Sequence, residues 1–226
     1  YKMKLLVDNA DLNEIKAVYN YLPIDGVTTN PSILAAAGRP PYEVLEEIRS
    51  FIGPDAELHV QVVSDTAEGM IEEAGVIREK LGDTTYVKIP TVPEGLRAMK
   101  KLAADGVNVT ATAIYTPMQA FLAAKAGAKY TAPYVNRIDN LGADGVETAE
   151  RIHDIFEKNG YDCEVLAASF KNTQQVLELC EYGVGASTVA PDVLKGLIKN
   201  QIVVDAVQAF TIDFEGLCGA GMTMAQ

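Results

Sequence analysis

The stretch TTYVKIPTVPEGLRAMKKLAADGVNVTAT, residues 84–112, contains two short apolar runs separated by an amphipathic segment. The runs TYVKIP (85–90) and VNVTAT (107–112) are rich in β-branched and aromatic residues, which favours buried strands. Between them, Pro93–Ala104 carries an apolar stripe at helical spacing, with a proline suited to a first turn and Gly106 suited to a helix stop. The stretch therefore predicts a strand–helix–strand unit, the building block of a parallel sheet.

The same alternation continues through the whole chain. Further apolar runs of strand length lie at residues 4–8, 25–30, 58–63, 129–135, 164–169 and 185–190. Helix signals lie between them, including a capping-box pattern at Asp11-x-x-Glu14 and an apolar stripe over Thr66–Leu81. Eight units without a linker predict the α/β class and a single (β/α)₈ TIM barrel domain over residues 1–226.

An open doubly wound sheet is the alternative fold. Such a sheet commonly shows a glycine-rich phosphate fingerprint after its first strand. The sequence at that position is VDNADLN (7–13), which contains no glycine. The barrel is therefore favoured.

The segment after the eighth unit predicts an additional C-terminal helix at residues 203–215. Val207, Phe210 and Phe214 share one face of that helix, so we expect it to pack on its own barrel or on a neighbouring subunit. The tail that follows, GLCGAGMTMAQ (216–226), is rich in glycine and is expected to be loosely ordered.

Composition excludes several classes of protein. The 226 residues are 48% hydrophobic and 22% charged, which is typical of a soluble globular protein. The net charge is 19 − 31 = −12, which argues against nucleic-acid binding. No apolar stretch of transmembrane length occurs, and no basic segment followed by an apolar one opens the sequence, so we expect neither a membrane span nor a signal peptide.

Cysteine and histidine are too few for a metal centre. The three cysteines, Cys163, Cys180 and Cys218, show no metal-ligand spacing, and only two histidines are present. We therefore expect no metal, no cofactor and no disulfide framework, and a cytoplasmic location. His59 is expected to be a structural residue on the outward face of its strand.

Chemistry in a (β/α)₈ enzyme comes from the carboxyl ends of the strands. The polar residues at these ends are Asp8, Thr28, Thr29, Asn30, Gln61, Lys88, Thr112, Tyr134, Arg137, Ser169 and Lys171. Most have an ordinary explanation, because Asp and Asn cap helices, Thr favours strands and Tyr packs in cores.

Lys88 is harder to explain structurally. An ammonium group in an apolar strand is costly unless it is paired, neutral or chemically used, and its own strand offers no carboxylate. Desolvation lowers the pKa of a lysine, and the neutral amine can attack a ketone to form a Schiff base. The iminium is an electron sink that allows a carbon–carbon bond to be made or broken.

Other strand ends supply groups that suit this chemistry. Asp8 can handle protons, and amide or hydroxyl groups can hold a water molecule or substrate hydroxyls; these are Asn30, Gln61, Thr112 and Tyr134. Arg137, Ser169 and Lys171 follow the sixth and seventh strands, close to the usual phosphate-binding region of the fold.

Four motifs resemble the transaldolase family, and the resemblance spans about Met3 to Phe214. They are GVTTNPSI (26–33), VKIP (87–90), APYVNRIDN (132–140) and LAASFKN (166–172). The match is closest to the small-subunit branch, which includes the fructose 6-phosphate aldolases. The resemblance implies a class I aldolase barrel in which Lys88 is the Schiff-base lysine.

The resemblance also implies roles for the other residues. Asp8 would act in proton transfer, and Gln61, Thr112 and Tyr134 would position the catalytic water or proton donor. Thr28 and Asn30 would line the substrate site, and a phosphate would be bound by Arg137, Ser169 and Lys171. Members of this branch assemble as decamers of two pentamers, in which the C-terminal helix reaches a neighbouring subunit.

Two activities compete within this family. Transaldolases transfer a dihydroxyacetone unit between sugar phosphates such as sedoheptulose 7-phosphate and glyceraldehyde 3-phosphate in the pentose phosphate pathway, whereas the aldolases release free dihydroxyacetone. Transaldolases typically carry Glu at the position of Gln61 and Phe at that of Tyr134. The resemblance therefore favours cleavage of fructose 6-phosphate to dihydroxyacetone and glyceraldehyde 3-phosphate. A non-catalytic sugar-phosphate binding protein is the alternative from another class.

Overall fold

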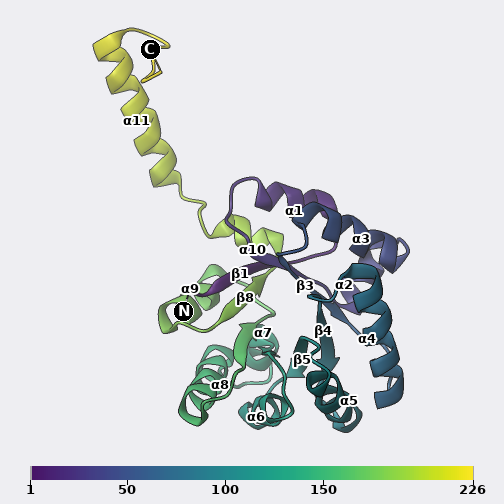
Figure 1. Ribbon diagram of the computed structural model, residues 1–226. Coiled ribbons are helices and arrows are strands. Elements are labelled where there is room, and N and C mark those ends of the chain that lie inside the picture. The colour runs from purple at the N-terminus through teal and green to yellow at the C-terminus, as the bar shows by residue number, and fades with distance from the viewer. Residues whose placement is uncertain (1, 226) are drawn as a thin grey trace.

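Eight parallel strands close into a barrel in the computed structural model, which describes residues 2–225 (Figure 1). The strands are β1 (Lys4–Asp8), β2 (Gly26–Thr28), β3 (Glu57–Gln61), β4 (Tyr86–Pro90), β5 (Val109–Ile114), β6 (Tyr130–Pro133), β7 (Glu164–Ala167) and β8 (Ala186–Val189). Each strand pairs with its neighbours in the chain, and β1 also pairs with β8. The closed barrel confirms the predicted fold and excludes the open doubly wound sheet.

Helices surround the barrel as an outer layer. They are α1 (Leu12–Tyr19), α2 (Pro31–Ala37), α3 (Pro41–Ile52), α4 (Ala67–Leu81), α5 (Pro93–Ala104), α6 (Pro117–Lys125), α7 (Val135–Asp139), α8 (Gly145–Asn159), α9 (Thr173–Tyr182) and α10 (Pro191–Gly196). A further helix, α11 (Gln201–Cys218), follows them and lies outside this layer. The β2–β3 and β6–β7 connections each contain two helices, where the alternation predicted one. The core lies between the barrel wall and this helical layer.

Helix starts follow the local sequence closely. The predicted α5 has the observed bounds, and Thr66 caps α4 by accepting a hydrogen bond from the Gly69 N–H. The Asp11 side chain accepts from two backbone N–H groups of α1, as predicted. The reciprocal half of the expected capping box is absent from this described segment, because the Asp11 N–H donates to Asn9 at 2.7 Å. Glu14 instead pairs with Lys195 of α10 at 2.9 Å.

The predicted outward position of His59 was wrong. The residue is fully buried inside the barrel: its register partner is Tyr86, and residues two apart on a strand share one side, so both point to the side of Lys88. Its Nδ1 lies 2.8 Å from Thr110 Oγ1 and its Nε2 lies 3.2 Å from Glu57 Oε2. The imidazole also stacks on Tyr86, with ring centroids 4.5 Å apart. Both ring nitrogens are thus occupied, which gives His59 a structural role on the inner face.

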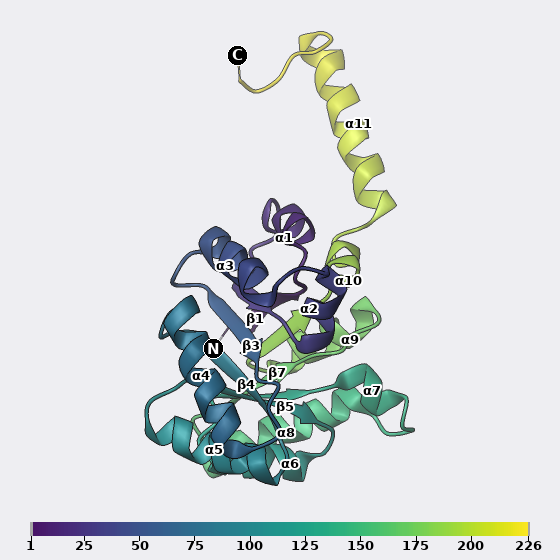
Figure 2. The same cartoon turned by 90° about the vertical axis from the view of Figure 1, so that its right-hand side faces the viewer.

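The additional helix α11 extends away from the barrel (Figures 1 and 2). It is longer than predicted, since residues 216–218 of the supposedly loose tail continue the helix to Gly219, which has a φ of 108°. No side chain of α11, all of which is described, is buried. Its exposed large apolar residues are Ile202, Val203, Val204, Val207, Phe210, Ile212 and Leu217. The helix therefore carries an apolar surface that its own barrel does not cover.

Within residues 2–225, no helix combines the length and the apolar character that crossing a membrane requires. The same residues contain no group of three His, Cys, Asp or Glu side chains arranged to hold a metal ion.

Candidate active site

A cavity lies at the carboxyl ends of the strands, with an empty volume of about 570 Å³ that includes the open space at its mouth. Seven of the ten predicted site residues line it: Asp8, Thr28, Asn30, Lys88, Tyr134, Arg137 and Ser169. The remaining lining comes from Ala132, Leu166, Ala168 and Thr188. The barrel thus brings together side chains that the sequence places on six different strand ends.

Lys88 is buried at the centre of this set, with 6% of its surface exposed. Its Nζ donates a hydrogen bond to the backbone carbonyl of Thr29 at 2.7 Å. Burial lowers the pKa of Lys88, and the charge of Asp8 opposes that change. A larger fraction of this amine is therefore neutral near pH 7 than in an exposed lysine, and the neutral amine is the form that attacks a carbonyl.

Asp8 is the carboxyl group that faces Lys88. Burial raises its pKa, whereas the charge of Lys88, a hydrogen bond from Thr28 and the charge of Arg137 lower it. The Thr28 hydroxyl donates to Asp8 Oδ1 at 2.8 Å. Burial pushes both Asp8 and Lys88 towards their neutral forms, and their mutual attraction resists this. Such a carboxyl group is suited to give and to take a proton during a reaction.

Tyr134 lines the cavity from the start of α7, and its hydroxyl is paired with a buried threonine. That hydroxyl lies 2.6 Å from Thr112 Oγ1, so the fully buried Thr112 is connected to the site through Tyr134. The guanidinium of Arg137 lies over the Tyr134 ring, 4.9 Å from its centroid, and Tyr115 packs edge-on against the same ring. Tyr134 is thereby held between a hydrogen bond and a cation–π contact.

Two residues at the rim adopt left-handed backbone conformations that are unusual outside glycine. Ala113 has a φ of 57° and lies where the register of β5 shifts, next to Thr112. Ser169 has a φ of 63°, and its backbone carbonyl accepts a hydrogen bond from the Asn136 N–H at 2.8 Å. That bond joins Ser169 to the helix that carries Arg137. Strained backbone of this kind is concentrated at functional sites.

Three predicted residues do not line the cavity. Thr112 reaches it only through Tyr134. Gln61 is the register partner of Lys88, but it borders a separate, largely apolar hollow formed by β3, α2, α3 and α4. Lys171 is exposed, two residues beyond Ser169. Asn30 does line the cavity, and its side chain also caps α2 by accepting from the Ile33 N–H at 2.9 Å.

Sequence reasoning missed Thr188, which lines the cavity from β8. Its signal in the sequence is a polar residue near the end of the eighth apolar run, GASTVA (185–190). The apolar lining residues Ala132, Leu166 and Ala168 carry no sequence signal that separates them from other strand residues.

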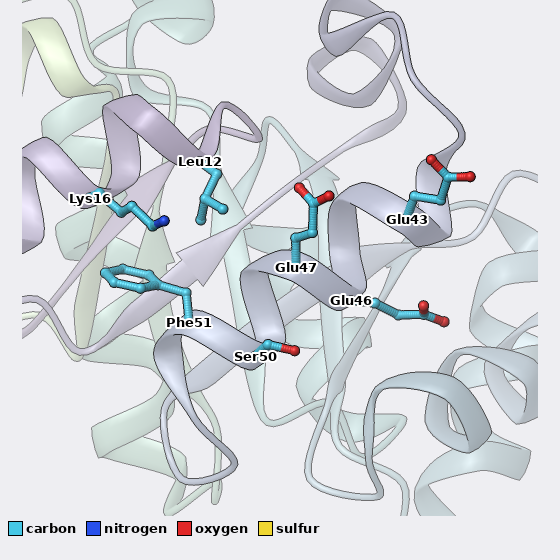
Figure 3. Close-up of a pocket in the computed structure, with 7 residues that line it drawn as sticks. All are labelled: Leu12, Lys16, Glu43, Glu46, Glu47, Ser50 and Phe51. Carbon is cyan, nitrogen blue, oxygen red and sulfur yellow. The ribbon is translucent and has the colours of Figure 1, made fainter.

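Figure 3 shows a different hollow, on the outside of the barrel between α1 and α3. It is lined by Leu12, Lys16, Glu43, Glu46, Glu47, Ser50 and Phe51, none of which lines the cavity around Lys88. The Lys16 ammonium lies 5.5 Å from the centroid of the Phe51 ring, and Arg39 pairs with Glu47. Charged side chains of this kind are typical of helix surfaces that face solvent.

The sequence matches the family model described as Transaldolase/Fructose-6-phosphate aldolase over residues 5–221. It is 38% identical over 215 residues to a protein named probable transaldolase from Geobacter sulfurreducens, a match that covers 95% of this chain and 99% of the relative. Proteins of the same name from Geotalea daltonii (39% identical, 94% and 98% covered) and a Hydrogenobaculum species (37% identical, 94% and 97% covered) are similar over 213 residues each. The chain therefore belongs to the transaldolase/fructose-6-phosphate aldolase family.

Proposed function

We propose that this protein is a class I aldolase that reversibly cleaves fructose 6-phosphate to dihydroxyacetone and glyceraldehyde 3-phosphate. The observation that carries the proposal is the buried Lys88 amine, which shares its cavity with the Asp8 carboxyl group. A desolvated lysine beside a carboxyl group is the pair that Schiff-base chemistry requires.

The reaction begins when the neutral amine of Lys88 attacks the C2 carbonyl of the ketose. Loss of water leaves an iminium, and the Asp8 carboxylate takes the proton of the C4 hydroxyl. The C3–C4 bond breaks, its electron pair moves into the enamine, and the aldehyde leaves. Protonation at C3 and addition of water then release dihydroxyacetone and restore the amine.

Recognition of the phosphate is assigned to Arg137 and Ser169 at the mouth of the cavity. Arg137 offers a fork of N–H donors that fits phosphate oxygens, and the Ser169 hydroxyl lies on the same rim. The resemblance adds Lys171, which is exposed beyond Ser169 and would need to turn inwards to contact the same group. In the proposed site Asn30 and Thr28 contact the substrate hydroxyls.

Transfer between sugar phosphates is the second candidate function, because the relatives named above are called probable transaldolases. The feature that favours release of free ketone is the Tyr134 hydroxyl in the cavity, paired with Thr112 at 2.6 Å. In the family resemblance a phenylalanine at this position accompanies transfer. A hydroxyl group here can support protonation of the enamine, which ends the reaction as free dihydroxyacetone.

Replacement of Tyr134 by phenylalanine is expected to shift the products from release towards transfer. The ratio of free dihydroxyacetone to the product formed with erythrose 4-phosphate should fall by about tenfold, the scale of one lost hydrogen bond in a transition state. Both products can be measured in one reaction by chromatography. Tyr161→Phe is the matched control, since Tyr161 packs on Phe156 away from the cavity. A wild-type enzyme that transfers without releasing any free ketone would be a transaldolase.

Assembly is the other part of the proposal: α11 docks on a second copy of the chain, within a decamer of two pentamers. Its apolar side chains, among them Phe210 (70% exposed) and Ile202 (77% exposed), are uncovered in a single chain. Burying such side chains stabilises an interface by about 1.5–3 kcal/mol each. A second barrel is therefore the expected partner for this helix.

Introducing a charge on that surface is expected to dissociate the assembly. Phe210→Asp would place a carboxylate in the apolar contact, whereas Gln208→Asp adds the same charge on another side of α11. Sedimentation equilibrium should show a smaller species for Phe210→Asp and the wild-type mass for Gln208→Asp. If Phe210→Asp keeps the wild-type mass at micromolar concentration, the docking proposal is wrong.

A further inference from the structure

Hydrogen bonds connect two threonine hydroxyls, one after the other, to the Asp8 carboxyl group. In the closed barrel β1 lies between β2 and β8, so Asp8 has Thr28 on one neighbouring strand and Thr188 on the other. The Thr28 hydroxyl donates to Asp8 Oδ1 at 2.8 Å, and Thr28 Oγ1 is also within hydrogen-bond distance of Thr188 Oγ1. Both threonines line the cavity, and both are buried, with 0% and 3% of their surfaces exposed.

The direction of these hydrogen bonds follows from the number of protons. Each hydroxyl carries one hydrogen, and an ionised carboxylate can only accept. Since the Thr28 hydrogen goes to Asp8, the hydrogen between the two threonines must come from Thr188. The three residues therefore form a chain in which Thr188 donates to Thr28 and Thr28 donates to Asp8.

The same chain can accommodate a protonated Asp8. The carboxyl O–H would then donate to Thr28, which in turn would donate to Thr188, and the Thr188 hydrogen would turn towards the cavity. Rotation of the hydroxyl groups thus keeps the three side chains connected in both protonation states. The hydrogen bonds to the ionised carboxylate are the stronger ones, so the chain favours the charged form of Asp8.

We propose that Thr188 is a positioning residue for Asp8, which it orients and holds in its charged form through the Thr28 hydroxyl. This inference rests on the proposed function, in which Asp8 exchanges a proton with the substrate. Thr188 itself takes no part in the bond cleavage. Its register partner on β1 is Leu6, two residues before Asp8, so it supports the carboxyl group from deeper in the barrel.

The charged and titratable groups around Asp8 are known from the cavity lining. They are Lys88 from β4, Tyr134 at the end of β6 and Arg137 from α7. Replacing the Thr188 hydroxyl leaves all three in place. Because hydrogen bonds to a charged acceptor are stronger than those to a neutral one, loss of the chain should disfavour the carboxylate and raise the pKa of Asp8.

The test compares three variants of the full chain. Thr188→Val keeps the shape and removes the hydroxyl, and Thr188→Ser retains the hydroxyl. The control is Thr131→Val: Thr131 is fully buried on β6, and its hydroxyl has no hydrogen-bond partner in the described part of the chain. The Asp8 carboxyl group is titrated by ¹³C NMR and assigned with Asp8→Asn, and kcat and KM for fructose 6-phosphate are measured against pH.

Thr188→Val is expected to titrate Asp8 at higher pH and to move the acidic limb of the kcat profile in the same direction. At the acidic end kcat should fall by about tenfold with little change in KM. Thr188→Ser should restore both, and Thr131→Val should change neither. A purely structural role would lower the melting temperature without moving the titration, so an unmoved Asp8 titration in a folded Thr188→Val overturns the inference.

The two readouts separate this inference from the proposed function. If the Asp8 titration moves but the wild-type enzyme cleaves no sugar phosphate, the hydrogen-bond chain stands and the proposed function fails. If the wild-type enzyme cleaves fructose 6-phosphate and the titration does not move, the function stands and the role of Thr188 fails.

Discussion

Lys88→Met should abolish turnover and leave the barrel folded. The thioether fills the space of the lysine stem but cannot form a Schiff base, so kcat should fall by about 10⁴-fold or more, as when an essential nucleophile is lost. The variant also removes a buried ammonium, which costs free energy in the native state. We therefore expect its free energy of unfolding to equal or exceed that of the wild type, a pattern typical of active-site residues.

Borohydride reduction in the presence of dihydroxyacetone is the direct measurement. The wild-type protein should gain one stable adduct, and peptide mapping should place it on Lys88. Lys158→Met is the matched control, because Lys158 is an exposed lysine that pairs with Asp154 at the end of α8. That variant should be trapped and should turn over normally. A folded wild-type protein that forms no adduct would favour the non-catalytic sugar-phosphate binding protein.

Asp8→Asn is expected to separate formation of the Schiff base from cleavage. The amide cannot take the proton of the C4 hydroxyl, so kcat should fall by about 10²–10⁴-fold, the usual contribution of a general base. The charge of Asp8 raises the pKa of Lys88, so its removal should lower that pKa further and leave more neutral amine. Trapping of dihydroxyacetone by borohydride should therefore persist in this variant.

The pH dependence of trapping tests the direction in which the pKa of Lys88 changes. A lysine with a lowered pKa loses its proton at lower pH, so the trapping rate of Asp8→Asn should reach its plateau at lower pH than that of the wild type. The outcome that contradicts the assignment is a variant that traps poorly and still cleaves fructose 6-phosphate at the wild-type rate. Asp8 would then support attack by the amine rather than breakage of the carbon–carbon bond.

Much of the fold was predictable because the signals that begin and end its helices and strands are local in the sequence. The run at residues 4–8 is β1, and Pro93 and Gly106 bracket α5 closely. The division of residues 31–52 into α2 and α3 was not predicted. The segment PSILAAA is short and mostly apolar, so it has no clear polar face, and the left-handed Gly38 that ends α2 interrupts any longer period.

The site was predictable where a side chain lies on a strand and less so beyond its end. Lys88 and Asp8 line the cavity because strand parity fixes the side on which they point. Lys171 was grouped with Ser169 by distance along the chain. A serine gives no sequence signal for a left-handed backbone conformation. Ser169 nevertheless has a φ of 63°, which changes the direction of the chain before Lys171.

Two further residues show where local patterns are weakest. Gln61 ends β3 as the register partner of Lys88, yet it borders a different hollow, and its predicted role stays a prediction. Thr188 was missed because a threonine in a strand has an ordinary explanation, its strand propensity. Only the closure of β8 onto β1 places it near Asp8, and no local pattern encodes that contact between the two ends of the barrel.

That closure also determines when the surroundings of Lys88 are complete. On the ribosome β1 emerges early, but its second neighbour, β8, is among the last strands to be made. Until β8 joins, one wall of the barrel is missing and water can reach Lys88, so we expect its pKa to stay closer to that of an ordinary lysine. The lowered pKa of this amine is therefore a property that the chain gains only when its last strand closes the barrel.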